Sequence, residues 1–151
     1  MSNRIDFVTQ IKDLNLLKQA LNLMSRDLME DPNVKLKAPL KLQKDMTIRR
    51  YQDNTEDCQY GIKLEGLYDL GLDKDTDGYY KFVADDELLN PDKDYSNRGK
   101  KGRSIVGTQG GKLLQYYFLA KQKKESQGQL VTYGFEEVTG DILIDTHVGI
   151  R

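Results

Sequence analysis

The stretch YDLGLDKDTDGYYKFVAD, residues 68–85, decides the fold that the sequence predicts. Its apolar side chains recur at every second residue on both sides of a turn-rich segment between Asp73 and Gly78. They are Tyr68, Leu70, Leu72, Tyr80, Phe82 and Ala84. A period of two is typical of strands that bury one face. The stretch therefore predicts a half-buried β-hairpin.

Two further strands are predicted before this hairpin. Residues 57–64 alternate polar and apolar side chains, and residues 46–51 do so more weakly. The polar segment Gln52 to Glu56 separates these two strands, and Glu65 with Gly66 forms a short turn into the hairpin. Because antiparallel strands can be joined by short turns, the four strands are expected to form an antiparallel meander.

Two amphipathic helices are predicted on either side of the meander. Asp13 is a suitable N-cap for a helix from residue 13 to about residue 27, which carries leucines and Met24 at helical spacing. Leu113, Tyr117 and Ala120 mark a second helix from about Gln109. Strands are also expected at residues 5–11, 131–135 and from 142. The order β-α-β-β-β-β-α-β-β predicts an α+β fold, a mostly antiparallel sheet with two helices on one face.

Length and charge favour a single domain, residues 1–151, without a strong overall field. The chain has 23 Lys and Arg against 24 Asp and Glu, which gives a net charge of −1. A charged partner must therefore be bound by a local patch. Irregular loops are expected near residues 30–45 and 86–108, because prolines, glycines and charged residues interrupt the periodicity there.

The predicted compartment is the cytoplasm. No window approaches the roughly 20 apolar residues that a membrane span requires, and the mean hydropathy is −0.68. The first residues carry charges and lack the apolar core of a signal peptide. The single Cys58 cannot form an internal disulfide, so a reducing compartment is expected. Cys58 lies on the apolar face of its predicted strand, together with Tyr60, Ile62 and Leu64, and is interpreted as a buried small hydrophobe.

One group of acidic residues has the spacing of a weak calcium site. Asp73, Asp75 and Asp77 precede Gly78, as in the first half of a calcium-binding loop. The position that should supply a bidentate glutamate is Ala84, and the flanking segments read as strands. The favoured interpretation is a hairpin tip with solvated carboxylates, so neither a metal nor another cofactor is predicted.

One basic segment is a candidate binding site for anions. Arg98, Lys100, Lys101 and Arg103 lie among glycines shortly before the second helix, and Lys112 and Tyr116 follow in that helix. These residues could bind phosphate or nucleic acid, with tyrosines as stacking faces. A flexible basic loop has the same composition, and the acidic stretch 85–94 beside it would cancel much of its field.

No catalytic group is recognised. His147 is the single histidine, and Asp145 lies on the same face of the predicted last strand. A surface pair is the favoured interpretation, since no serine or cysteine nucleophile motif accompanies them. The chain is therefore predicted not to be an enzyme.

Three stretches resemble a known family: FVTQIKDLNLLKQAL at 7–21, RRYQDNTEDCQYGIKL at 49–64, and residues 113–144. Through these stretches the chain resembles the hypothetical chloroplast open reading frame thirty-five family, also called domain of unknown function twelve fifty-seven, and looks like a divergent member of it. Tryptophans usual in that family are replaced here by Asp85, Asp86 and Glu87. The family is uncharacterised, and its occurrence in cyanobacteria and plastids implies a soluble accessory role, with the plastid stroma as an alternative compartment.

The sequence favours a non-enzymatic accessory or protein-interaction module. Its partner is expected to be another protein, and no membrane association is expected. The alternative is an RNA- or DNA-binding protein that uses the basic loop 98–103, with nucleic acid as its partner.

Overall fold

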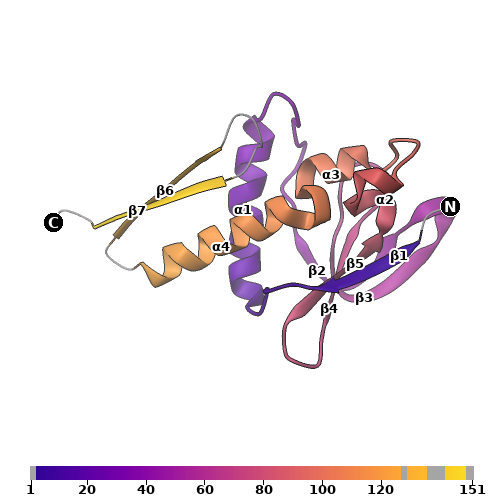
Figure 1. Cartoon of the computed structure of the whole chain (residues 1–151), viewed down its shortest axis with the longest axis horizontal. Coiled ribbons are helices and arrows are strands. Elements are labelled where there is room, and N and C mark those ends of the chain that lie inside the picture. Colours follow the sequence, from indigo (N-terminus) through magenta and orange to yellow (C-terminus); the bar gives the residue numbers. More distant parts are fainter. Residues whose placement is uncertain (1–2, 127–128, 136–141, 149–151) are drawn as a thin grey trace.

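A five-stranded antiparallel sheet and two long helices form the main body of the protein in a computed structural model (Figure 1). The structure describes residues 3–126, 129–135 and 142–148, with side chains up to residue 126. The sheet strands are β1 Arg4–Val8, β2 Leu42–Arg49, β3 Thr55–Ile62, β4 Leu70–Lys74 and β5 Tyr80–Asp85. The helices are α1 Leu14–Glu30, α2 Asp86–Leu89, α3 Lys100–Val106 and α4 Gly111–Glu125, and the last strands are β6 Gln129–Phe135 and β7 Ile142–Val148.

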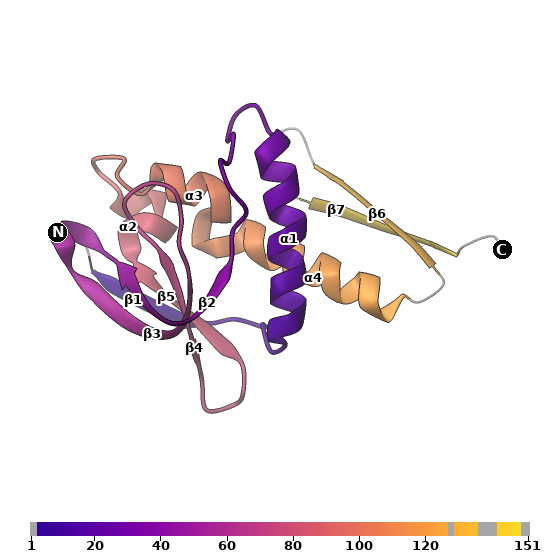
Figure 2. The ribbon, with the colours of Figure 1, turned by 180° about the vertical axis from the view of Figure 1, so that it is seen from behind.

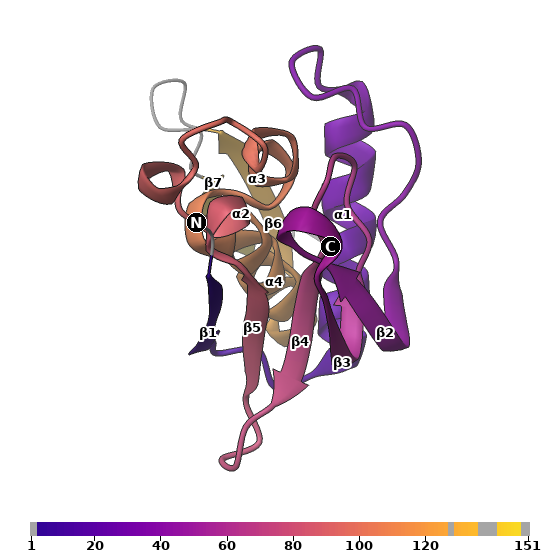
Figure 3. The same cartoon turned by 90° about the vertical axis from the view of Figure 1, so that its right-hand side faces the viewer.

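The predicted hairpin and meander are confirmed. The strand order is β1-β5-β4-β3-β2, so β2 to β5 follow one another as sequence neighbours, and β1 is added at the edge of β5 (Figure 3). In the hairpin of β4 and β5, Leu72 lies opposite Phe82. The Gly78 N–H closes the turn by donating to the Asp75 carbonyl at 3.0 Å.

The predicted packing of two helices on one sheet face is also confirmed. The alternating side chains of the hairpin, among them Leu70, Leu72 and Phe82, are buried in one core with the apolar faces of α1 and α4. The Tyr116 hydroxyl of α4 donates to Asp27 Oδ2 of α1 at 2.7 Å. The Tyr117 hydroxyl accepts from the N–H groups of Lys12 and Asp13. These contacts fix α4 against α1.

Asp13 is the N-cap of α1, as predicted. Its Oδ1 accepts from the N–H groups of Asn15 at 2.8 Å and Leu16 at 3.2 Å. The hydrogen bond from Leu16 lowers the pKa of Asp13 below its ordinary value of 3.8. The cap therefore stabilises the fold above pH 3.8, and this contribution is lost as the pH falls through the lower pKa of the folded state.

Asp13→Ala is expected to reduce the free energy of unfolding by about 1 kcal/mol at neutral pH. Asp13→Ser keeps an oxygen acceptor and is expected to restore most of this loss. Urea unfolding at pH 7 and at pH 3 measures both variants, and the alanine deficit should be smaller at pH 3. Equal losses for the alanine and serine variants at pH 7 would contradict the capping role.

The segment 86–108, predicted to be irregular, contains α2, α3 and two short 3₁₀ turns, Pro91–Lys93 and Thr108–Gly110. The prediction of a structureless loop is wrong because helices of four and seven residues are too short to show a period. In α3, the buried Gly102 lets Leu88 approach, and Ile105 and Val106 enter the core. Tertiary packing therefore stabilises a helix that its composition disfavours.

The first loop is shorter than predicted, and the last two strands are separate from the main sheet. Residues 31–41 are irregular, but β2 begins at Leu42 instead of residue 46 and pairs Leu42 with Ile62. Gln43, Lys44 and Asp45, which follow Leu42, are polar and exposed because β2 is an edge strand. The strands β6 and β7 are confirmed, yet they form their own two-stranded sheet, with α1 and α4 between it and the main sheet (Figures 1 and 2).

The main sheet is curled, so that strands that are not neighbours in the sheet order contact each other across its second face. β1 and β3 are separated by two strands in the sheet order, yet Arg4 Nε donates to Glu56 Oε1 at 2.7 Å. The Tyr51 N–H, at the tip between β2 and β3, donates to Asp85 Oδ2 at the end of β5. The curled hairpin encloses a small cluster around Ile48, Cys58 and Val83. Loops and edges are therefore the main surfaces left for binding.

No helix in the described residues is long and apolar enough to span a bilayer.

Candidate functional site

Arg98, the first cation of the predicted basic loop, is paired with the buried carboxylate of Glu87. Its guanidinium donates to both carboxylate oxygens of Glu87, from Nε to Oε1 at 3.1 Å and from Nη2 to Oε2 at 3.0 Å. It also lies over the Tyr51 ring, 4.0 Å from the ring centre. Two parallel hydrogen bonds to a carboxylate are a strong form of ion pair. The Arg98 guanidinium is therefore held by Glu87 and Tyr51 at the end of the sheet.

Glu87 is 3% exposed and is the centre of this arrangement. The Tyr68 hydroxyl donates to its Oε1 at 2.5 Å. Hydrogen bonds from Arg98 lower the pKa of Glu87, while burial and the Glu87 carboxylate raise the pKa of Tyr68. Glu87 is therefore held as a carboxylate whose oxygens already have donors, which makes it a structural anchor.

Arg103 is engaged in the same way. Its Nη1 donates to the Glu87 carbonyl at 2.7 Å, and its Nη2 donates to Asp94 Oδ2 at 3.1 Å. Asp94 Oδ2 also accepts from the Gly99 N–H at 3.0 Å. Two of the predicted anion-binding cations therefore connect α2 to α3. The acidic stretch that was expected to weaken the basic loop's field pairs with it directly.

The other predicted contact residues do not come together. Lys100 is exposed, whereas Lys101 donates to the Val34 carbonyl at 3.0 Å. Lys112 is partly buried beside the Ser104 carbonyl at 3.4 Å, and burial lowers its pKa. Tyr116 is 0% exposed, so its prediction as a contact residue is wrong: its ring belongs to the core between α1 and α4.

The calcium candidate is not supported. Within residues 3–126, no three His, Cys, Asp or Glu side chains gather where they could hold a metal ion, and this includes Asp73, Asp75 and Asp77. Asp73 Oδ1 accepts from the Gln59 N–H at 2.7 Å, which ties the start of the hairpin turn to β3.

Cys58 is buried, as predicted. Burial, with the nearby carboxylates of Asp73 and Glu56, raises its pKa to about 12, so its thiol stays protonated at neutral pH. The backbone of Asp145 and His147 lies in β7, but the side chains of this pair are outside the described residues.

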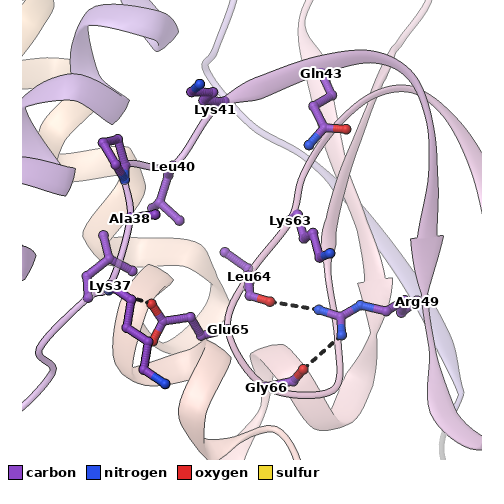
Figure 4. Close-up of a pocket in the computed structure, with 12 residues that line it drawn as sticks. Lys37, Ala38, Leu40, Lys41, Gln43, Arg49, Lys63, Leu64, Glu65 and Gly66 are labelled. Carbon is purple, nitrogen blue, oxygen red and sulfur yellow. Dashed lines mark hydrogen bonds between the residues drawn. The ribbon is translucent and has the colours of Figure 1, made fainter.

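A groove that the sequence did not predict lies between two segments far apart in the chain (Figure 4). We call it the lysine groove. One wall is the irregular segment 36–41, and the other is the turn 63–66 between β3 and β4. Its volume is about 450 Å³, and Gln43 and Arg49 of β2 complete its lining. Leu36 and Leu40 of one wall and Leu64 of the other are buried in the same hydrophobic core, which holds the two walls together.

The lysine groove is strongly cationic. Its lining includes Lys37, Lys41, Lys63 and Arg49 against a single carboxylate, that of Glu65. The three lysines are exposed, and no carboxylate of residues 3–126 forms an ion pair with them. Glu65 Oε2 accepts from the Lys37 N–H at 2.7 Å, and its Oε1 lies 3.5 Å from Lys101 Nζ. Three ammonium groups are therefore free to bind an anionic ligand.

Arg49 shapes the groove instead of serving as a free cation. Its guanidinium donates to both carboxylate oxygens of the buried Asp69, and also to the carbonyls of Leu64 at 2.7 Å and Gly66 at 2.9 Å (Figure 4). Asp69 Oδ1 accepts from the Leu64 N–H as well. The turn that forms one wall is thus fixed by charge-assisted hydrogen bonds on both sides.

A larger hollow, of about 840 Å³, lies between the link from β1 to α1 and the end of α4. Two of the three lysines in its lining have internal partners: Lys124 Nζ lies 3.6 Å from Asp13, and Lys12 Nζ lies 5.3 Å from the centre of the Tyr79 ring. Two carboxylates, those of Asp13 and Glu125, also line this hollow, so it is less cationic than the lysine groove and a weaker candidate for binding an anion.

Comparison of the chain with family models, with curated proteins and with solved structures found no match. The resemblance to the chloroplast open reading frame family stays a prediction.

Proposed function

We propose that the chain is a non-enzymatic protein-interaction module that binds an acidic segment of another protein in the lysine groove. The observation that carries the proposal is the contrast between cations. Arg98 and Arg103 are paired with buried carboxylates, whereas Lys37, Lys41 and Lys63 line one groove without a carboxylate partner among residues 3–126. With a net charge of −1, the attraction for an acidic partner must come from such a local patch.

The groove suits an acidic protein better than a nucleic acid. No aromatic side chain is among its lining residues, and single-strand binders stack bases on aromatic rings. The loop 98–103, on which the nucleic-acid alternative depends, has both arginines engaged in internal pairs. The titratable side chains of the groove are lysines, one arginine and the hydrogen-bonded Glu65, a set better suited to binding than to proton transfer.

Charge reversal in the groove tests the proposal. The probe is a fluorescent peptide of eight residues that alternates glutamate and leucine, and its binding is measured by anisotropy. The triple variant Lys37→Glu, Lys41→Glu, Lys63→Glu is expected to bind it about tenfold or more weakly, because three attractive pairs become repulsive. The matched control is Lys74→Glu, Lys93→Glu, Lys123→Glu, which makes the same charge change at exposed lysines away from the groove.

The control variant is expected to retain most of the affinity. Equal losses in the two triple variants would show a nonspecific charge effect and contradict the proposal. A single-stranded oligonucleotide of the same charge is measured in parallel. Tighter binding of the oligonucleotide than of the peptide, lost on mutation of Lys100 and Lys101, would favour the nucleic-acid alternative instead.

A further inference from the structure

The last two strands form a ribbon of only two strands. β6 and β7 pair over their full length of seven residues, from Gln129 opposite Val148 to Phe135 opposite Ile142. Neither has a second neighbour among the described strands, and the ribbon lies beyond α1 and α4, away from the main sheet (Figures 1 and 2). A two-stranded sheet is marginally stable by itself, so a further strand paired at one of its edges would stabilise it.

The two edges of the main sheet carry features that oppose pairing with another chain. β1 has only five residues, and Arg4 and Asp6 on it are exposed. β2 is longer, but Lys44 and Asp45 on it are exposed, and its regular geometry is interrupted at Asp45, where φ is 52°. Short length, charged side chains and local irregularity are the usual protection of edge strands. These two edges therefore disfavour strand addition.

By contrast, the edge of β6 on the side away from β7 has no charge. Its sequence is QLVTYGF, residues 129–135, without a charged residue or a proline. The neighbouring β7 contains Asp145 at its centre and His147 near its end. An uncharged edge strand of this length is a ready site for pairing with another chain. Among the described strands, β6 therefore has the edge most suited to strand addition.

We infer that the protein forms a dimer in which β6 pairs with β6 of a second copy, antiparallel and centred on Thr132. A two-fold axis places the same segment on both sides of such an interface. Thr132 is the middle residue of β6, so this register pairs all seven residues. It sets Thr132 opposite its own copy and Val131 opposite Tyr133 of the second copy. Pairs of threonines, and pairs of a β-branched with an aromatic residue, stabilise antiparallel strands.

Charge favours this occupant over others. A pair of β7 strands centred in the same way would set Asp145 opposite its own copy, and like charges directly opposite each other destabilise a sheet. An acidic segment, the proposed ligand of the lysine groove, would find no cation along β6. A second β6 brings no charge and supplies a main-chain partner at each position. The dimer does not depend on the proposed function, because residues 36–66 line the lysine groove.

Thr132→Cys tests the dimer and its register together. The Cα atoms of the two residues 132 would lie about 4.5 to 5.5 Å apart, close enough for a disulfide between the copies. Oxidation by dissolved oxygen with a copper catalyst is therefore expected to convert most of this variant to a covalent dimer on a non-reducing gel. Gln129→Cys is the matched control, because its two copies would lie roughly 20 Å apart, six residues out of register. The buried Cys58 is common to both variants.

The mass of the wild-type protein in solution is the second measurement. Sedimentation equilibrium over a concentration series is expected to give about twice the 17.3 kDa of one chain. The variant Lys37→Glu, Lys41→Glu, Lys63→Glu is expected to keep this mass, so loss of peptide binding and loss of the dimer are separate results. A wild-type protein that stays at the mass of one chain into the millimolar range would overturn the inference. A dimer in which Thr132→Cys and Gln129→Cys cross-link equally, or not at all, would show that the copies meet through another surface.

Discussion

Glu87→Ala is expected to reduce the free energy of unfolding by about 3 kcal/mol, a large part of the stability of a domain of this size. The substitution leaves the Tyr68 hydroxyl without its acceptor in a site where Tyr68 is 2% exposed. It also removes both hydrogen bonds of the Arg98 guanidinium. Breaking one partner of a buried pair is costly because the other partner stays desolvated.

The magnitude lies at the lower end of the range for buried pairs because Arg98 can turn toward solvent, its side chain being 34% exposed. Urea unfolding of both proteins measures the difference, and Asp92→Ala provides the control. Asp92 is an exposed acid near the same network whose side chain makes no ion pair with residues 3–126, so little change is expected. A loss below about 1 kcal/mol for Glu87→Ala would refute its role as an anchor.

The pH dependence gives a second test of the same residue. The pKa of Glu87 is lowered from 4.5, chiefly by Arg98. A depressed carboxyl pKa stabilises the fold above the ordinary value, and this contribution is lost as the pH falls through the folded value. The difference between wild type and Glu87→Ala should therefore be constant near pH 7 and narrow below pH 4.5.

Gly99→Ala is expected to destabilise the protein by about 3 kcal/mol through a steric clash. A Cβ atom at position 99 would meet the Glu87 carbonyl oxygen at 2.0 Å and the Leu88 Cα atom at 2.9 Å. These neighbours are backbone atoms of α2, which cannot turn away as a side chain could. The substitution must separate α2 from the start of α3 and disturb the Gly99 N–H bond to Asp94.

Gly111→Ala is the matched control. Gly111 is the first residue of α4, and its φ and ψ are −62° and −34°. Apart from its chain neighbours and the backbone of its own helix, no atom lies within 4 Å of the position where its Cβ would be. Alanine is expected there without loss of stability, since it is the better helix former. Thermal unfolding of the two variants should separate them by several degrees or more. Similar melting temperatures would show that α2 and α3 adjust freely.

Local periodicity predicted the elements whose burial alternates regularly. The hairpin of Leu72 and Phe82, the meander before it and the α1 cap at Asp13 follow from patterns of residues that are near one another in the sequence. The helix α3 did not, because glycines and cations at 99–103 are typical of loops and the packing of Gly102 against Leu88 is visible only in three dimensions. Periodicity also predicted the strands β6 and β7, but not that they form a separate sheet, since strand periodicity does not specify which sheet a strand joins.

The candidate site was missed for a similar reason. Lys37 and Lys41 lie in a segment recognised as a lysine-bearing loop, but Lys63 belongs to a turn more than 20 residues away in the sequence. The tertiary fold brings them to one groove, and the Arg49 and Asp69 contacts fix the second wall. Conversely, the clustered cations of residues 98–103 predicted a binding site, yet Arg98 and Arg103 form internal ion pairs with Glu87 and Asp94.

The position of β1 has a consequence for how the chain is assembled during translation. The N–H of Asn3 bonds to Asp86, a partner 83 residues away in sequence. Strands β2 to β5 can join as they leave the ribosome, since each pairs with its immediate neighbour. β1 emerges before β2 to β5 but has no partner until β5 has been synthesised, so the outer edge of β5 stays open until the β1 segment returns to close it.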